Sequence, residues 1–180
     1  ARLSTVYIPG HKITMLPPDV VDRYTLVQGQ AWAAVSLYLQ VREDSLEITG
    51  SQTRIERVQI ADNLRHDRLD HIVTLPWLED PSFSHQEDPE ALAHTRAALS
   101  FLHRLARQRK SVREEVRGKP ESFNRPDYNY RLLGTTASPA DGEPRGDEQV
   151  EISVRQRGSP LDLLVAEALI LANSTWGNWL

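Results

Sequence analysis

The segment 161–180, LDLLVAEALILANSTWGNWL, constrains the fold most, because it places one carboxylate, Glu167, in the middle of an apolar stretch. At helical spacing the apolar residues around it fall on one face: Leu163, Leu164, Ala168, Leu171 and Ala172. A charge on such a face needs a partner, because an isolated ion is costly to bury. We therefore predict a C-terminal helix over about residues 160–175 that brings Glu167 to a partner.

Both ends of the sequence suggest an excerpt from a larger domain. The first residue is Ala1 and the single Met is Met15, and no charged-then-apolar leader is present. The last residues include Trp176, Trp179 and Leu180, where a helix usually leaves the core in polar residues. We expect the chain to be an interior portion of a catalytic or binding domain.

Composition narrows the class of protein. The 180 residues are 39% hydrophobic and 26% charged, which is typical of a soluble globular domain with one core. Cysteine is absent, which excludes disulfides, thiolate zinc sites and cysteine nucleophiles and favours a cytoplasmic location. No apolar run approaches the ~20 residues that a membrane span requires. The net charge is -4, so nucleic-acid binding would have to use local basic patches.

Periodicity predicts an α+β fold. Runs rich in β-branched and aromatic residues predict strands over 2–8, 31–41, 46–58, 128–133 and 148–156, the second and third joined as a hairpin. Helical spacing predicts helices over 18–24, about 90–117 and about 160–175, with short helical turns between 63 and 78. Gly, Pro and Ser mark 134–146 as a flexible surface loop. We expect a mainly antiparallel sheet packed against the two long helices.

The second half of the predicted helix 90–117 is strongly basic. Seven Lys or Arg residues lie between His103 and Lys119, against Glu114 and Glu115. One interpretation is a solvated helix face laced with ion pairs, and the other is contact with phosphate groups.

Three blocks, taken in order, resemble the catalytic (RNB) domain of the ribonuclease II and ribonuclease R exoribonucleases. The first is STVYIPG at 4–10 followed by Met-Leu-Pro at 15–17. The second is Arg-Pro-Asp-Tyr at 125–128, and the third is VAEALILAN at 165–173, which is similar to the family's "VEE…AN" helix. Together the blocks span essentially the whole chain, which the resemblance identifies as a partial ribonuclease II type domain over 1–180.

The resemblance implies 3′-to-5′ hydrolysis of single-stranded RNA, with release of nucleoside 5′-monophosphates. In this family Mg²⁺ ions about 4 Å apart stabilise the attacking and leaving oxygens. The aspartates that bind them precede the Tyr7 block, and the catalytic arginine follows the last block, so the resemblance places no metal ligand in this chain. It implies a substrate-holding part that does not cleave RNA unaided and that has the remainder of its own domain as a partner.

The resemblance also assigns roles to aromatic residues. Tyr7 stands where the family stacks an aromatic on a base near the 3′ end, with a strand Tyr packed on a sheet as the alternative. Phe123 lies near the second stacking aromatic, one residue closer to the second block than expected. His66 occupies a position where relatives carry a tyrosine, and the alternative is a surface histidine.

Polar residues complete the implied site. Glu167 matches the second carboxylate of the family's Glu-Glu pair and is a catalytic candidate, whereas Ala166 replaces the first. The alternative for Glu167 is an interhelical salt bridge. Asn173 is expected to order its neighbours through its amide or to cap the helix, and Arg125 to bind phosphate or to pair with Asp127.

Two other functions remain open. The chain could be a non-catalytic RNA-binding derivative of the domain. A second metal chemistry is also conceivable in the segment 66–71, because His66 and Asp70, and likewise Asp67 and His71, share a face if the segment is helical. Such a cluster would make the protein a His/Asp metal-dependent phosphohydrolase, although a loop of exposed ion pairs explains the segment more simply.

Overall fold

The computed structural model describes residues 3–8, 11–84, 90–121, 126–133, 149–155 and 157–178, and for residues 66, 67, 90, 91 and 155 the backbone alone. The chain divides into two compact units. The strand unit comprises Ala1–Ala33, Arg57–Ala61 and Asn124–Gln156, and the helical unit comprises Ala34–Glu56, Asp62–Phe123 and Arg157–Leu180. The predicted loop 134–146 lies outside the described residues.

A short hairpin opens the strand unit. β1 (Val6–Ile8) pairs with β2 (His11–Ile13) in antiparallel register, so that Tyr7 stands opposite Lys12. The helix α1 (Pro18–Tyr24) follows, and it begins on a proline, whose missing N–H is not needed in the first turn of a helix. These elements place Tyr7 on an exposed strand.

A second antiparallel hairpin of the strand unit joins β5 (Asp127–Leu133) to β6 (Gln149–Arg155). Side chains alternate between the faces of a strand, so the register gathers the apolar residues of both strands on one face: Tyr128, Tyr130, Leu132, Val150, Ile152 and Val154. Among the described residues of this unit, every side chain is partly or fully exposed.

A longer hairpin consists of β3 (Ala31–Val41) and β4 (Ile48–Gln59), and its turn belongs to the helical unit. The turn is closed by two backbone hydrogen bonds, from Arg42 N to Glu47 O and from Leu46 N to Arg42 O, each of 2.9 Å. Leu46 adopts a φ of 56°, a left-handed conformation that is uncommon for a residue with a side chain of this size.

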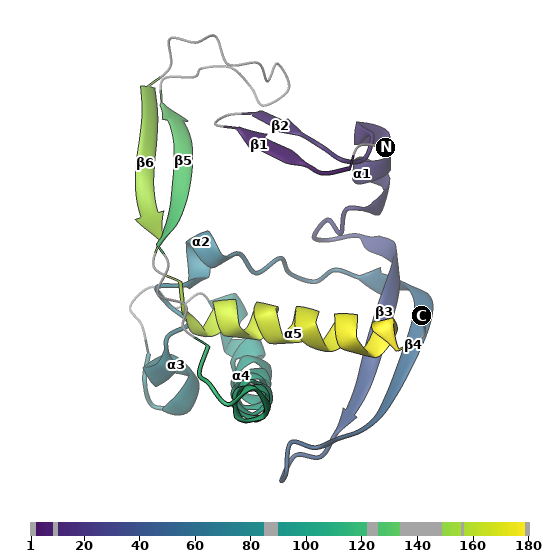
Figure 1. Cartoon of the computed structure of the whole chain (residues 1–180), viewed down its shortest axis with the longest axis vertical. Helices are drawn as coiled ribbons and strands as arrows, with labels where there is room; N and C mark the ends of the chain where they lie inside the picture. Colours follow the sequence, from purple (N-terminus) through teal and green to yellow (C-terminus); the bar gives the residue numbers. More distant parts are fainter. Residues whose placement is uncertain are drawn as a thin grey trace. The chain divides into compact units, whose positions relative to one another are not determined.

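Four helices build the core of the helical unit: α2 (His66–Leu69), α3 (Leu75–Glu79), α4 (Glu90–Arg117) and α5 (Pro160–Gly177). The helix α4 packs against both α3 and α5 (Figure 1). Eight of the buried apolar residues form one cluster: Leu69, Ile72, Val73, Trp77, Leu78, Leu92, Leu99 and Leu161. Trp77 is fully buried in this cluster, and the guanidinium of Arg96 lies 4.7 Å from the centroid of its ring.

The start of α5 is fixed by a capping box. Ser159 Oγ accepts a hydrogen bond of 3.1 Å from the backbone N–H of Asp162, and the Asp162 carboxylate accepts one of 3.3 Å from the Ser159 N–H. Ser159 Oγ also donates to Asp70 Oδ1 at 2.9 Å. Near the other end of α5, Trp176 Nε1 donates to Thr53 Oγ1 of β4 at 3.1 Å. Both ends of α5 are therefore tied to the rest of the helical unit.

The predicted α+β class is confirmed, with antiparallel strands and two long helices close to the expected ranges. Among the described residues the strands form three two-stranded sheets and not one sheet, and the other differences are local. The first strand begins at Val6, and β2, which was not predicted as a separate strand, pairs with it. Within the described part of the chain, none of the helices combines the length and the apolar character that crossing a bilayer requires.

The stability of the helical unit is expected to depend on the protonation of His103 in α4. His103 is buried, and burial lowers its pKa, assisted by the nearby Arg107 and opposed by Glu79. As the pH falls below about 6.5, the unfolded chain binds a proton that the folded state binds only at lower pH, so the free energy of unfolding decreases.

Chemical denaturation at several pH values between 5 and 8 tests this expectation. Replacing His103→Gln should flatten the pH dependence, whereas the same change at the exposed His94 of α4 should leave it as in the wild type. Equal curves for the wild type and the His103→Gln variant would contradict the role of His103.

Candidate functional site

Glu167 is a buried carboxylate on α5, only 5% exposed, and its partner is Arg113 of α4. Arg113 Nη1 donates to Glu167 Oε2 at a distance of 2.6 Å. The expected need for a partner is thus met by an interhelical ion pair, the alternative considered for this residue. Because both side chains are largely shielded from water, the pair is held more rigidly than a surface salt bridge.

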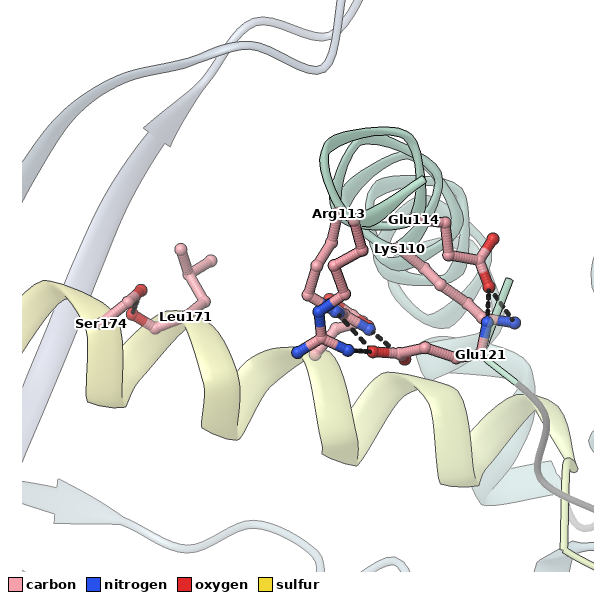
Figure 2. Close-up of polar contacts among 8 residues, drawn as sticks. Lys110, Arg113, Glu114, Glu121, Leu171 and Ser174 are labelled. Carbon is pink, nitrogen blue, oxygen red and sulfur yellow. Dashed lines mark hydrogen bonds and ion pairs between the residues drawn. The ribbon is translucent and has the colours of Figure 1, made fainter. Parts of the chain in front are cut away.

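The same guanidinium also binds Glu121, which follows α4 (Figure 2). Arg113 Nε and Nη2 donate to the two carboxylate oxygens of Glu121 at 3.0 and 2.6 Å, a bidentate arrangement. These hydrogen bonds raise the pKa of Arg113 and lower the pKa of Glu121. Arg117 pairs with the same carboxylate, and Glu114 accepts from the Glu121 backbone N–H at 2.7 Å. Glu121 is therefore fixed through both its side chain and its backbone.

The two carboxylate oxygens of Glu167 differ in their hydrogen bonding. Among the described residues, Glu167 Oε1 is buried and has no hydrogen-bond partner, whereas Oε2 is held by Arg113. A buried carboxylate oxygen without a donor is costly, and native proteins keep few of them. The side chain thus presents one acceptor atom that is available to a donor.

A largely apolar groove of about 460 Å³ runs along α4 and α5. It is lined mainly by leucine and alanine side chains of these helices and of β3, and Arg109 and Glu167 are its charged residues. The groove lies entirely within the helical unit.

The other candidate residues lie in different parts of the chain. Tyr7 is 77% exposed in the strand unit, whereas Glu167 belongs to the helical unit, and each unit is described by itself. Asn173 is exposed on α5, four residues before Gly177, where the helix ends. His66 begins α2, and its side chain is outside the description. Phe123 and Arg125 lie outside the described residues.

The segment 66–71 is only partly helical, since α2 ends at Leu69. Asp70 accepts the hydrogen bond from Ser159 at the start of α5, which gives its carboxylate a structural task. The phosphohydrolase alternative remains a hypothesis, because the side chains of His66 and Asp67 are outside the description.

The described side chains do not fit a magnesium site. Mg²⁺ is held by carboxylate and water oxygens, usually with more than one acidic group. Among the residues described, no three His, Asp or Glu side chains gather in a way that could hold an ion. Glu167 Oε2 is already neutralised by a guanidinium. No step of the chemistry can be assigned to a metal held by these residues.

The basic half of α4 is largely ion-paired. Six of the seven Lys and Arg residues between His103 and Lys119 lie on α4, and four of these contact carboxylates: Arg107, Lys110, Arg113 and Arg117. The geometry supports the ion-pair interpretation for these four. Arg109 is exposed and, within the described part of the chain, makes no ion pair, so it keeps its charge available at the groove.

Sequence reasoning did not single out Arg113 or Glu121. The sequence did contain an indication of this ion pair. A lone carboxylate on an apolar helix needs a cationic partner, and a basic helix in the same chain can supply one. Spacing alone could not select one residue among the seven Lys and Arg residues, because the partner is set by how α4 packs on α5.

Comparison with known proteins gives the family. The model of the RNB domain family matches residues 1–180. Exoribonuclease 2 of Vibrio vulnificus (strain YJ016) is 27% identical over 180 residues, which cover 99% of this chain and 24% of that protein. Exoribonuclease 2 of Vibrio cholerae serotype O1 is 29% identical over 133 residues, 73% of this chain and 18% of that protein. The chain thus spans about a quarter of the length of the first of these relatives, and it belongs to the RNB domain family, as the resemblance indicated.

Proposed function

We propose that this chain is the RNA-holding part of a 3′-to-5′ exoribonuclease that hydrolyses single-stranded RNA to nucleoside 5′-monophosphates in the cytoplasm. The observation that carries the proposal is the match of the RNB family model to all 180 residues, together with relatives that are named exoribonucleases. The absence of cysteine is compatible with a reducing compartment.

The proposal assigns RNA contact to both units. In the strand unit, the exposed ring of Tyr7 is free to stack on a base, and Lys12 opposite it supplies a positive charge for the backbone. In the helical unit, Glu167 and Asn173 of α5 are the polar candidates. The resemblance makes Phe123, Arg125 and His66 further candidates for RNA contact.

The chemical step is proposed to depend on Mg²⁺ bound by carboxylates outside these residues. The family resemblance supports this division of labour, and so does the ion pair in which Arg113 holds Glu167. This chain by itself is then expected to bind RNA without cutting it. A gel assay with 5′-labelled oligoribonucleotide, comparing the complete protein and this chain with and without Mg²⁺, tests the assignment. Cleavage by the isolated chain would contradict it.

Replacing Tyr7→Ala in the complete protein is expected to weaken binding of short single-stranded RNA by about 5- to 150-fold, because stacking of one base contributes roughly 1–3 kcal/mol. Affinity for Mg²⁺ should be unchanged, since Tyr7 is proposed to touch a base and no metal. Fluorescence anisotropy with a labelled oligoribonucleotide measures the first quantity, and isothermal titration calorimetry measures the second.

Two variants serve as controls for Tyr7. Tyr7→Phe keeps the aromatic face and should bind RNA nearly as the wild type does. Tyr24→Ala removes another exposed tyrosine of the strand unit and should have little effect. If Tyr7→Ala reduces RNA and Mg²⁺ affinity equally, or if it behaves like Tyr24→Ala, the stacking role is wrong.

A further inference from the structure

We propose that the groove along α4 and α5 is a docking surface, filled in the complete protein by an apolar segment from outside these 180 residues that donates a hydrogen bond to Glu167 Oε1. The segment is expected to carry a neutral hydrogen-bond donor and, beside Arg109, an acidic side chain. The proposal goes beyond the activity on RNA and holds whether or not the protein degrades RNA.

The walls of the groove combine buried and exposed apolar side chains. Leu99 and Leu105 of α4 and Leu161 of α5 are buried. Leu102 of α4 and Val165 of α5 also line the groove, and both are about half exposed. A soluble protein rarely leaves a contiguous apolar surface in water, and where it does, the surface commonly binds a partner. The groove therefore favours an apolar occupant.

Glu167 gives the groove a polar feature that calls for a donor. Its side chain lines the groove and is almost fully buried, and among the described residues Oε1 accepts no hydrogen bond. A buried acceptor without a donor costs free energy, and native proteins keep few of them. A donor carried by the occupant of the groove would remove that cost.

The charges around Glu167 indicate which kind of donor fits. Glu167 and Glu121 share the guanidinium of Arg113, and Arg117 contacts Glu121 as well. Two carboxylates are thus balanced by two guanidinium groups. A further cation beside Glu167 would be buried without a counter-ion, which is costly. A neutral hydroxyl, amide or indole N–H can satisfy Oε1 without that cost.

Arg109 supplies charge complementarity for the docking segment. It lines the groove, is exposed and, within the described part of the chain, makes no ion pair. An acidic side chain of the segment can pair with this guanidinium while the apolar side chains of the segment fill the groove. Such a pair would set the direction in which the segment lies, because the acceptor Glu167 and the cation Arg109 differ in what they bind.

The length of the relatives indicates where the occupant comes from. This chain corresponds to 24% of the Vibrio vulnificus relative, so a family member of that length has ample further chain to fill the groove. A segment of the same polypeptide has a high effective concentration and loses less entropy on docking than a separate molecule does. A second copy of the chain and a small apolar molecule are the other occupants, and the test separates them.

Thiol labelling of the complete protein tests whether the groove is covered. These 180 residues contain no cysteine, so Leu102→Cys places a single thiol of this region in the groove. Leu75→Cys on α3 is the matched control outside the groove, since the two leucines are 46% and 48% exposed. Leu102→Cys is expected to react with a maleimide about tenfold or more slowly than Leu75→Cys, because a covered thiol reacts only when the segment opens locally.

Mass spectrometry of the labelled peptides gives the rate at each position, under conditions where circular dichroism shows the variants folded. Val165→Cys on α5 repeats the measurement from the other helix and carries the test if Leu102→Cys does not fold. Reaction in the groove as fast as at Leu75→Cys would overturn the proposal.

Two further measurements identify the occupant. Protection that does not change on dilution of the protein, without added mass in native mass spectrometry, is expected for a segment of the same polypeptide. Protection that is lost on dilution would show a second copy, and added mass would show a bound small molecule. Either of these results overturns the assignment to the same polypeptide.

Glu167→Gln tests the hydrogen bond to Oε1. The amide must turn its oxygen toward Arg113, so it presents an NH₂ group where Oε1 was, and a donor of the segment cannot bind there. In the Leu102→Cys background this change should raise the labelling rate by about fivefold or more, because a buried donor of the segment then lacks its acceptor. Glu121→Gln changes a carboxylate on the same guanidinium but does not line the groove, so it should leave the rate unchanged.

Arg109→Glu tests the acidic partner in the same background. Reversing the charge should raise the labelling rate by about fivefold or more, because like charges then repel. Arg104→Glu makes the same change at an exposed residue of α4 outside the groove and should have no effect. Equal rates for Glu167→Gln and Glu121→Gln would overturn the hydrogen bond to Oε1, and equal rates for Arg109→Glu and Arg104→Glu would overturn the acidic partner.

Discussion

Replacing Arg113→Met is expected to lower the free energy of unfolding by about 3–5 kcal/mol, because removing one partner of a buried ion pair leaves the other charge without compensation. Glu167 is 5% exposed and already has one oxygen without a donor, so loss of the guanidinium would leave the whole carboxylate unpaired. Chemical denaturation of the protein, followed by circular dichroism, measures the change.

Two comparisons make this result specific. Arg107→Met removes the same charge from α4 but breaks only the exposed pair with Glu79, and it should cost no more than about 1 kcal/mol. Adding Glu167→Leu to Arg113→Met should recover part of the lost stability, because the double variant no longer contains a buried carboxylate without a partner. A loss in Arg113→Met no larger than in Arg107→Met would show that the buried pair does not hold α4 to α5.

Replacing Trp77→Ala is expected to lower the free energy of unfolding by about 3–5 kcal/mol, the range for truncating a fully buried aromatic side chain. Trp77 is 0% exposed and belongs to the cluster of buried apolar residues described for the helical unit. The change would leave a cavity in the cluster that includes Leu92 and Leu99 of α4 and would also remove the ring beneath the Arg96 guanidinium.

The exposed Leu75 of the same helix provides the control for Trp77. Leu75→Ala should change the free energy of unfolding by well under half of the Trp77→Ala effect, because its side chain is 48% exposed and leaves little cavity behind. Denaturation curves of the two variants under the same conditions make the comparison. Similar losses for both would contradict the location of the core.

Much of the fold could be predicted because its elements have strong local signals. The strand β3 and the helix α4 follow the β-branched run and the helical spacing closely. The strand β2 was missed because His11–Ile13 is too short for alternation to be visible, and only pairing with β1 defines it. Long strands and helices could therefore be predicted from the sequence, whereas a strand of three residues could not.

The site was predictable only in part. The sequence indicated that Glu167 needs a partner, and the structure supplies Arg113. The sequence also predicted an apolar face that included Ala168, but Ala168 is exposed and Glu167 is buried, because α5 turns its carboxylate toward α4. The helix α5 is apolar on most sides, so the periodicity of its sequence did not indicate which face is buried. Packing against α4 determines that face.

Photo-crosslinking tests the central claim, that these residues hold the RNA strand, most directly. An oligoribonucleotide with 4-thiouridine near its 3′ end is irradiated with the complete protein, and the crosslinked peptides are identified by mass spectrometry. The account predicts crosslinks in the peptides that contain Tyr7 and residues 122–125, lost from the first peptide in Tyr7→Ala. Crosslinks found only outside these 180 residues would contradict it.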